Sequence, residues 1–180
     1  MAATRQLPAL SLEAAKAAAD AAEQKAKQMG MGKYPLLAPT GNEPVRLLQY
    51  RTLNFTILPD FNIALVDSTT HLLHFIRMPN AKLTSIQTAI DKAFTAAGHR
   101  APTSTYAGKN FLPGGPAFGI HNTNGGRFNI IGGGLPIMVD GVCVGAIGVS
   151  TGTPAQDIEC ATAGVEAVEK VVQRRQGAKL

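Results

Sequence analysis

Apolar and polar residues follow two different periods along this chain of 180 residues. Three stretches repeat apolar positions every three or four residues, as on one face of a helix, and five shorter stretches have the composition and spacing of strands. The predicted order is helix, two strands, helix, loop, three strands, helix. Because this order has no repeating strand–helix unit, it predicts an α+β fold: a five-stranded, mainly antiparallel sheet with helices packed on it.

Two helices are predicted in the first hundred residues. The first begins at Ser11, continues through an alanine-rich body and ends at Gly30, since serine suits an N-cap and glycine a C-cap. The second extends to Gly98, and the spacing of Thr84 and Gln87 predicts a capping box at its start. Alanines at four-residue spacing along the second helix predict that it lies close against a sheet.

The third helix is predicted to follow a capped turn. Thr153 suits the N-cap, Pro154 suits the first helical position, and Gln156 completes a capping box with Thr153. The helix is expected over residues 155–173. Asp157, in its first turn, is expected to support the helix N-terminus rather than to perform acid–base chemistry.

The five predicted strands fall into a hairpin and a three-stranded meander. Their ranges are Asn62–Asp67, His71–Met78, Phe128–Ile131, Leu135–Val139 and Val142–Val149. Residues 68–70 form the turn of the hairpin. Asp140–Gly141 joins the last two strands, because a type I′ turn requires positive φ at both central residues.

Length and composition predict one globular domain over residues 1–180, since 45% of the residues are hydrophobic and 16% are charged. Residues 31–59 interrupt the pattern of apolar and polar positions, because several prolines surround a stretch that could form a strand or an irregular segment. Residues 100–124 are rich in Pro, Gly, Thr and Asn, which predicts a surface loop with a short helix. We expect this loop to form the rim of any binding pocket.

The charge pattern narrows the class of partner. The net charge of +5 is spread thinly, and no basic block is interleaved with aromatic residues, so we predict a small-molecule ligand and no nucleic acid. The sequence shows neither a signal-peptide pattern nor a long apolar stretch, which predicts a cytoplasmic protein with no membrane partner. Cys143 and Cys160 are predicted to be buried free thiols.

Lys92 is the most notable candidate for chemistry, because the residues around it in the second helix are alanine, isoleucine and phenylalanine. Partial burial of such a lysine would lower its pKa or favour a bound carboxylate. The alternative is a structural lysine that pairs with Asp91, with Asp67 or with a carbonyl at the end of a strand. Both interpretations are open from the sequence.

Arg77 and the histidines offer further candidates. Arg77, at a strand end, could clamp an anion or fix a turn by donating to carbonyls. His71 and His74 are three residues apart in a strand and therefore point to opposite faces, so we predict no metal site there. His99 and His121 flank the central loop and could approach a ligand together. The candidates for acid–base catalysis are Lys92, Arg77 and His74.

The triple glycine at 132–134 allows two interpretations. A strand, not a helix, follows it, which argues against a phosphate-binding loop. The missing side chains could let a flat ligand reach backbone amides, or they could allow a bulge where a helix crosses the sheet. The predicted ligand-binding residues are Lys92, Thr103, Ser104, Gly132, Gly133, Gly134 and His121.

Four segments carry a family resemblance. They read LEAAKAAADAAEQKAKQMG, IALVDSTTHLLHFIRMPNA, AIDKAFTAA and GGGLPIMVDGVCVGAIGVSTGTPAQD. In this order they resemble the GlcG/HbpS-like family, which includes the C-terminal domain of PduO-type proteins. The resemblance implies a profilin-like α-β-α fold, assembly into homo-oligomers such as octamers, and haem binding in some members.

The chain departs from the family in two ways. Some haem-binding relatives use a histidine of the first helix, and residues 11–30 contain none. The family passes almost directly from the first helix to the first strand, whereas this chain has the additional segment 31–59. The resemblance therefore leaves the cofactor open, haem included.

Three hypotheses for function follow. The first is an oligomeric protein that binds a small molecule or cofactor, either haem or another planar or anionic ligand. The second is a cofactor-independent isomerase, lyase or cyclase that acts on a small carbonyl compound. The third is an accessory subunit without chemistry of its own.

Overall fold

The computed structural model describes residues 7–30 and 60–177, so the segment 31–59 lies outside the described residues. The described helices and strands are α1 (Leu12–Gln28), β1 (Asn62–Asp67), β2 (Leu72–Arg77), α2 (Ser85–His99), β3 (Gly134–Val139), β4 (Val142–Ser150) and α3 (Pro154–Gly177). Between α2 and β3 the chain forms short 3-10 turns, η2 (Thr103–Ala107), η3 (Lys109–Phe111), η4 (Ile120–Asn122) and η5 (Asn124–Gly126). The helices in this part of the chain include none long and apolar enough to cross a membrane.

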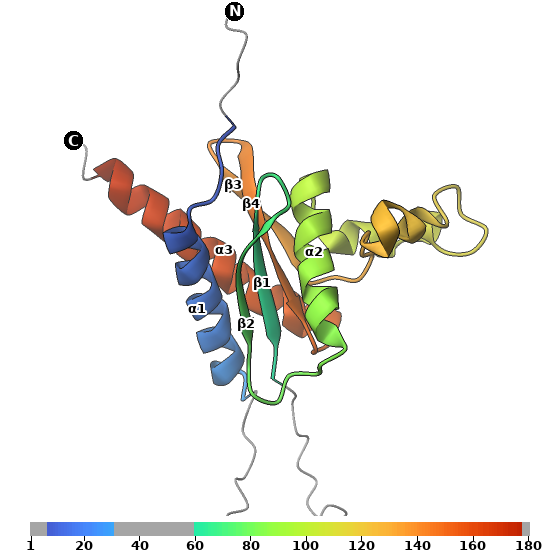
Figure 1. Cartoon of the computed structure of the whole chain (residues 1–180), viewed down its shortest axis with the longest axis horizontal. Coiled ribbons are helices and arrows are strands. Elements are labelled where there is room, and N and C mark those ends of the chain that lie inside the picture. Colours follow the sequence, from blue (N-terminus) through green and yellow to red (C-terminus); the bar gives the residue numbers. More distant parts are fainter. Residues whose placement is uncertain (1–6, 31–59, 178–180) are drawn as a thin grey trace, which may run out of the picture.

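The strands form an antiparallel sheet in the order β2-β1-β4-β3. Helices α1 and α3 cover one face and α2 covers the other (Figure 1). Strand β1 is buried on both faces: Ile63 and Leu65 pack toward α1 and α3, and Ala64 and Val66 pack toward α2. The α+β prediction is therefore confirmed.

The predicted strand Phe128–Ile131 is wrong, since the sheet of the described residues has four strands rather than five. Side chains, rather than a neighbouring strand, form hydrogen bonds with backbone groups of this segment. The N–H of Asn129 donates to Thr95 Oγ1 at 2.8 Å, and the carbonyl of Ile131 accepts from Thr103 Oγ1 at 2.7 Å. An apolar pattern does not distinguish a strand from a segment that is extended but held by side chains.

Two of the predicted N-caps are confirmed. Ser11 Oγ accepts from the N–H of Ala14 at 3.2 Å. At the start of α3, the N–H of Thr153 donates to Gln156 Oε1 at 2.9 Å, and the N–H of Gln156 donates to Thr153 Oγ1 at 3.4 Å. Helix α3 ends at Gly177, beyond the predicted end.

The capping box at the start of α2 is wrong. Thr84 has helical φ and ψ of −67° and −18°, and its side chain makes no capping hydrogen bond. The carbonyls of Lys82 and Leu83 accept the first N–H groups of the helix instead. Gln87 donates to Asp91 Oδ1 at 2.8 Å and so points along the helix, away from its start.

Both hairpin turns use positive φ. Asp140–Gly141 has φ of 49° and 76°, which agrees with the predicted type I′ turn. In the turn between β1 and β2, Thr70 has φ of 70°, an uncommon conformation for a β-branched residue. The carboxylate of Asp67 holds this turn, because its Oδ1 accepts from the N–H groups of Thr69 at 2.8 Å and His71 at 3.2 Å.

Candidate functional site

A buried ion pair joins α2 to the first turn of α3. Lys92 Nζ lies 2.7 Å from Asp157 Oδ2 and donates to the carbonyl of Val149 at 2.9 Å. The second carboxylate oxygen of Asp157 accepts from the N–H of Gly152 at 3.0 Å. Only 1% of Lys92 and 2% of Asp157 is exposed. The ammonium and both carboxylate oxygens therefore have partners inside the protein.

Burial governs the titration of this pair. It lowers the pKa of Lys92, and the attraction of Asp157 offsets part of that shift. It raises the pKa of Asp157, and Lys92 and the N–H of Gly152 oppose that shift. The predicted desolvation of Lys92 is confirmed. Its carboxylate partner is Asp157, and neither Asp91 nor Asp67, the two carboxylates considered as alternatives. The carbonyl of Val149 matches the third alternative, a carbonyl at the end of a strand.

The triple glycine packs directly on this pair. Gly133 has φ of +120°, and a methyl group placed on it would come within 2.9 Å of Lys92 Nζ and 2.7 Å of Asp157 Cβ. The N–H of Gly134 donates to Thr103 Oγ1 at 2.9 Å. Gly133 is thus a place where only glycine allows the backbone to approach the buried charges. The geometry agrees with the structural interpretation of the glycines, and their role in ligand binding stays a prediction.

The structure brings most of the predicted ligand-binding residues together. Ser104 joins the group because a methyl group on Gly132 would lie 3.6 Å from Ser104 Cβ. Gly132, Gly133, Gly134, Lys92 and Thr103 are buried, whereas Ser104 is exposed. Ser104 is therefore the member of this group that can meet a ligand at the surface.

Arg77 and His74 lie on β2, the edge strand separated from β3 by two other strands. Arg77 is exposed and donates to the carbonyl of Pro79 at 3.2 Å, which is the turn-fixing alternative considered for it. His74 is half-buried and pairs with Leu65 across the sheet. The structure does not bring these two candidates to the Lys92 group.

His99 and His121 occupy different parts of the loop region. The Nδ1 atom of His99 lies 2.9 Å from the hydroxyl of Tyr106, and its ring packs on Phe128 with centroids 4.6 Å apart. His121, in η4, packs edge-on against Phe118 with centroids 5.8 Å apart. In the described part of the chain, no three His, Cys, Asp or Glu residues are grouped to hold a metal ion.

The segment 100–133, which we call the α2–β3 loop, projects beyond α2 and away from the sheet (Figure 1). Its exposed apolar side chains include Leu112, Phe118 and Ile131, which are 49%, 54% and 48% exposed. The sequence has no Asp or Glu between Asp91 and Asp140. The surface of the loop therefore combines apolar groups with a positive charge.

Three basic residues supply this charge: Arg100, Lys109 and Arg127. Arg127 is already engaged, because its Nε donates to Asp91 Oδ1 at 3.2 Å and its guanidinium lies 3.9 Å from the centroid of the Phe94 ring. Arg100 and Lys109 are exposed. These two side chains can meet an anionic ligand.

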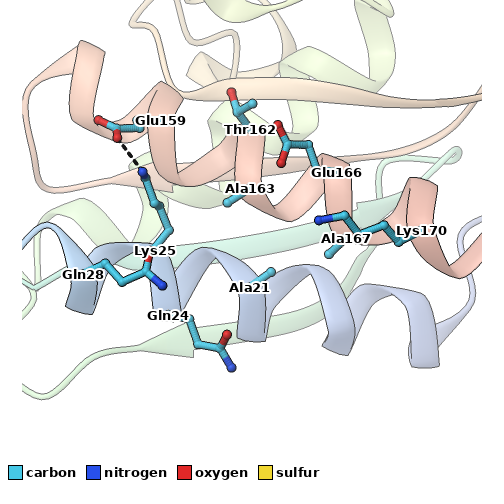
Figure 2. Close-up of a pocket in the computed structure, with 10 residues that line it drawn as sticks. All are labelled: Ala21, Gln24, Lys25, Gln28, Glu159, Thr162, Ala163, Glu166, Ala167 and Lys170. Atoms are coloured by element: carbon cyan, nitrogen blue, oxygen red, sulfur yellow. Dashed lines mark ion pairs between the residues drawn. The ribbon is translucent and has the colours of Figure 1, made fainter.

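A groove of about 440 Å³ runs between α1 and α3 (Figure 2). Small side chains from both helices, including Ala21 and Ala163, lie in it, and Lys25 is paired across it with Glu159 at 2.7 Å. This hydrogen bond raises the pKa of Lys25. The groove has charges of both signs and contains none of the predicted site residues. A smaller hollow of about 210 Å³ lies between the β3–β4 turn and the end of α3.

The family model described as haem degrading protein HbpS-like matches residues 57–166, a range that includes the ion pair and the whole α2–β3 loop. The chain belongs to the HbpS-like family. The resemblance to this family noted in the sequence is thus confirmed.

Two curated relatives match about half of the chain. An uncharacterized 15.0 kDa protein of Citrobacter freundii, from the dhaT-dhaS intergenic region, is 38% identical over 94 residues, which are 52% of this chain and 66% of that protein. Corrinoid adenosyltransferase PduO of Salmonella typhimurium is 32% identical over 93 residues, which are 51% of this chain and 27% of PduO. The chain spans less than two thirds of either relative.

Solved structures are similar over nearly the whole fold. Klebsiella pneumoniae protein ORFY has a TM-score of 0.75 at 25% identity, covering 94% of this chain and 97% of that one. HbpS has a TM-score of 0.68 at 27% identity, covering 91% and 93%. A complex of PduOC with heme has a TM-score of 0.68 at 24% identity, covering 88% and 94%, and at that identity it shows the shared fold alone.

Proposed function

We propose that this protein binds a small ligand, and that the ligand is haem or another planar, anionic molecule. The observation that carries the proposal is the α2–β3 loop, which exposes Leu112 and Phe118 in a stretch without acidic residues. Membership of the HbpS-like family and the fold shared with the heme complex of PduOC add support.

The chemistry of the loop suits such a molecule. A porphyrin is a flat apolar ring with two carboxylates on one edge, so it needs apolar contacts and cations together. Leu112 and Phe118 offer the first, and Arg100 and Lys109 offer the second. Haem, when bound, would supply an iron with free coordination positions.

The buried group is assigned a supporting role in this proposal. Lys92, Thr103 and the triple glycine fix the end of the loop where it enters β3, and Ser104 contacts the ligand at the rim. Catalysis by Lys92 has less support, because its side chain is 1% exposed and its ammonium already has two partners. No observation favours Arg77 or His74 as a catalytic group or the chain as an accessory subunit.

Assembly and location belong to the same proposal. We infer a homo-oligomer from the family resemblance. A cytoplasmic location is supported by Cys143 and Cys160, which are both free thiols and buried, as is usual in a reducing compartment.

Titration of the full chain with haemin tests the proposal. We expect a Soret band that shifts and saturates at micromolar haemin. Charge reversal in Lys109→Glu should weaken binding, because it replaces a cation of the loop by an anion. Lys170→Glu, which changes an exposed lysine of the α1–α3 groove, is the matched control and should leave binding unchanged. No saturable change at micromolar haemin would refute haem as the ligand, and weaker binding in Lys170→Glu alone would place the site in the groove.

A further inference from the structure

We propose that two copies of this chain associate through the groove between α1 and α3, with their α3 helices antiparallel about a two-fold axis. This inference rests on the homo-oligomer in the proposed function and names the face through which the copies meet.

The first observation is the shape of the groove. It is a hollow of about 440 Å³, and the half-buried side chains of Ala21, Ala163 and Ala167 lie in it (Figure 2). Side chains along its rim, including Gln24 and Thr162, are exposed. Because the alanine side chains are short, the side chains of another helix can enter between α1 and α3.

The second observation is the balance of charge in the groove. Lys25 and Lys170 are basic, and Glu159 and Glu166 are acidic. Lys25 pairs with Glu159, yet 51% of the Glu159 side chain stays exposed. Within residues 7–30 and 60–177, no ion pair involves Glu166 or Lys170, and both are exposed. A groove with both signs and no net charge suits a partner with the same charge pattern, and a second copy is such a partner.

The third observation is the order of these charges along α3. Glu159, Ala163, Glu166 and Lys170 follow one another at spacings of four, three and four residues, so they share one face of the helix. In an antiparallel pair with the two-fold axis between positions 163 and 166, Glu159 of each copy lies opposite Lys170 of the other. Ala163 then lies opposite Glu166. Each copy uses the same surface, as a two-fold interface requires.

The charges select the orientation of the two helices. A parallel pair about a two-fold axis would place Glu159 opposite Glu159 and Lys170 opposite Lys170, and such pairs of like charges are unfavourable. The antiparallel pair replaces them by two symmetric ion pairs. Exposed ion pairs add little stability on their own, so the attraction comes mainly from filling the groove, and the charges set its register.

The test uses charge reversal at positions 159 and 170. Sedimentation equilibrium of the full chain measures association over a range of concentrations. Glu159→Lys alone and Lys170→Glu alone each place like charges opposite each other at both ends of the contact. Each should therefore weaken association by about tenfold or more.

An equimolar mixture of the two variants is the decisive sample. In a mixed pair, both contacts again join a lysine to a glutamate, so association should return toward that of the wild type. Effects of a reversal within its own chain, such as the lost partner of Lys25, are the same in the mixture and in the single variant. Recovery on mixing therefore reports the contact between copies.

Lys16→Glu is the matched control, because it reverses an exposed lysine of α1 that does not line the groove, and it should leave association unchanged. Far-UV circular dichroism checks that each variant is folded. Single variants that associate like the wild type, or a mixture without recovery, would overturn this face and leave the homo-oligomer standing. A wild type that stays monomeric at every concentration would overturn both.

Discussion

Lys92 and Asp157 are 65 positions apart in the sequence and meet at 2.7 Å in the interior. The sequence placed Lys92 among apolar residues of a helix, and this was enough to predict its desolvation. It did not reveal Asp157 as the partner, because helical and strand periods carry no information about contacts between distant elements. From the sequence, Asp157 was expected only to support the N-terminus of its own helix. The structure does place it in the first turn of α3.

The ion pair predicts a large effect of removing one partner. Lys92→Met leaves the Asp157 carboxylate buried without a counter-charge, so we expect a loss of about 3–5 kcal/mol in the free energy of unfolding. Urea unfolding followed by circular dichroism measures this loss.

The double variant Lys92→Met/Asp157→Asn is the control for this prediction. It removes both charges and should be destabilised by much less than the sum of the two single variants. Single effects that add to within about 0.5 kcal/mol would show that the two side chains are not coupled.

Asp67 predicts a pH dependence of stability. Partial burial raises the pKa of Asp67, but hydrogen bonds from the Thr69 side chain and from the N–H groups of His71 and Thr69 outweigh it, so the pKa in the folded state is lowered. A lowered pKa stabilises the folded state above the unfolded-state value of about 3.9, and this stabilisation is lost as the pH falls through the folded-state pKa.

Asp67→Asn keeps an oxygen for the turn but removes the charge. Its urea midpoint should lie below that of the wild type by a constant amount at neutral pH, and the difference should narrow as the pH falls below about 4. A difference that is the same at pH 7 and pH 3 would contradict the role of the charge.

At the scale of elements, two threonines fix the α2–β3 loop. Thr95 Oγ1, on α2, accepts from the N–H of Asn129 and lies 3.3 Å from the carbonyl of Arg127. Thr103 Oγ1 lies between Ile131 and Gly134 and bonds to both. These bonds explain why Phe128–Ile131 is not a strand. Sequence reasoning selected Thr103 and missed Thr95, since nothing in the helical pattern marks an inward-facing threonine as a partner of a loop.

Thr103→Val should loosen the end of the loop. Valine has a similar shape but leaves the N–H of Gly134 and the carbonyl of Ile131 without a partner, so we expect a loss of about 1–3 kcal/mol in the free energy of unfolding. Thr105→Val, two residues on and exposed, is the matched control and should change stability by less than about 0.5 kcal/mol. Equal urea midpoints for the two variants would contradict this role of Thr103.

Residues that are close together in the sequence correctly predicted two helix starts and one hairpin turn. Ser11 and Thr153 cap their helices as predicted, and Asp140–Gly141 forms the predicted turn, because each involves neighbours within a few residues. The same spacing failed at Thr84, where preceding carbonyls had already accepted the N–H groups. Residue spacing alone therefore does not determine whether a capping box forms. The conformation of the chain just before the helix also matters.

At the scale of the whole molecule, the sheet order β2-β1-β4-β3 separates the candidate residues into two groups. Arg77 and His74 lie on one edge, and Lys92, Thr103 and the triple glycine lie where the chain enters the other edge strand. The sequence grouped the second set correctly through the triple glycine and the helix before it. The sequence could not distinguish the buried residues of this set from the exposed Ser104, because burial depends on how the elements pack against one another.

The central claim is that a planar, anionic ligand binds on the α2–β3 loop and not in the groove between α1 and α3. Hydrogen exchange of the full chain, measured by mass spectrometry with and without saturating haemin, tests it most directly. We predict slower exchange within residues 100–127 and unchanged exchange in α1 and the outer turns of α3. Protection confined to α1 and α3, or no change anywhere in the chain, would contradict the claim.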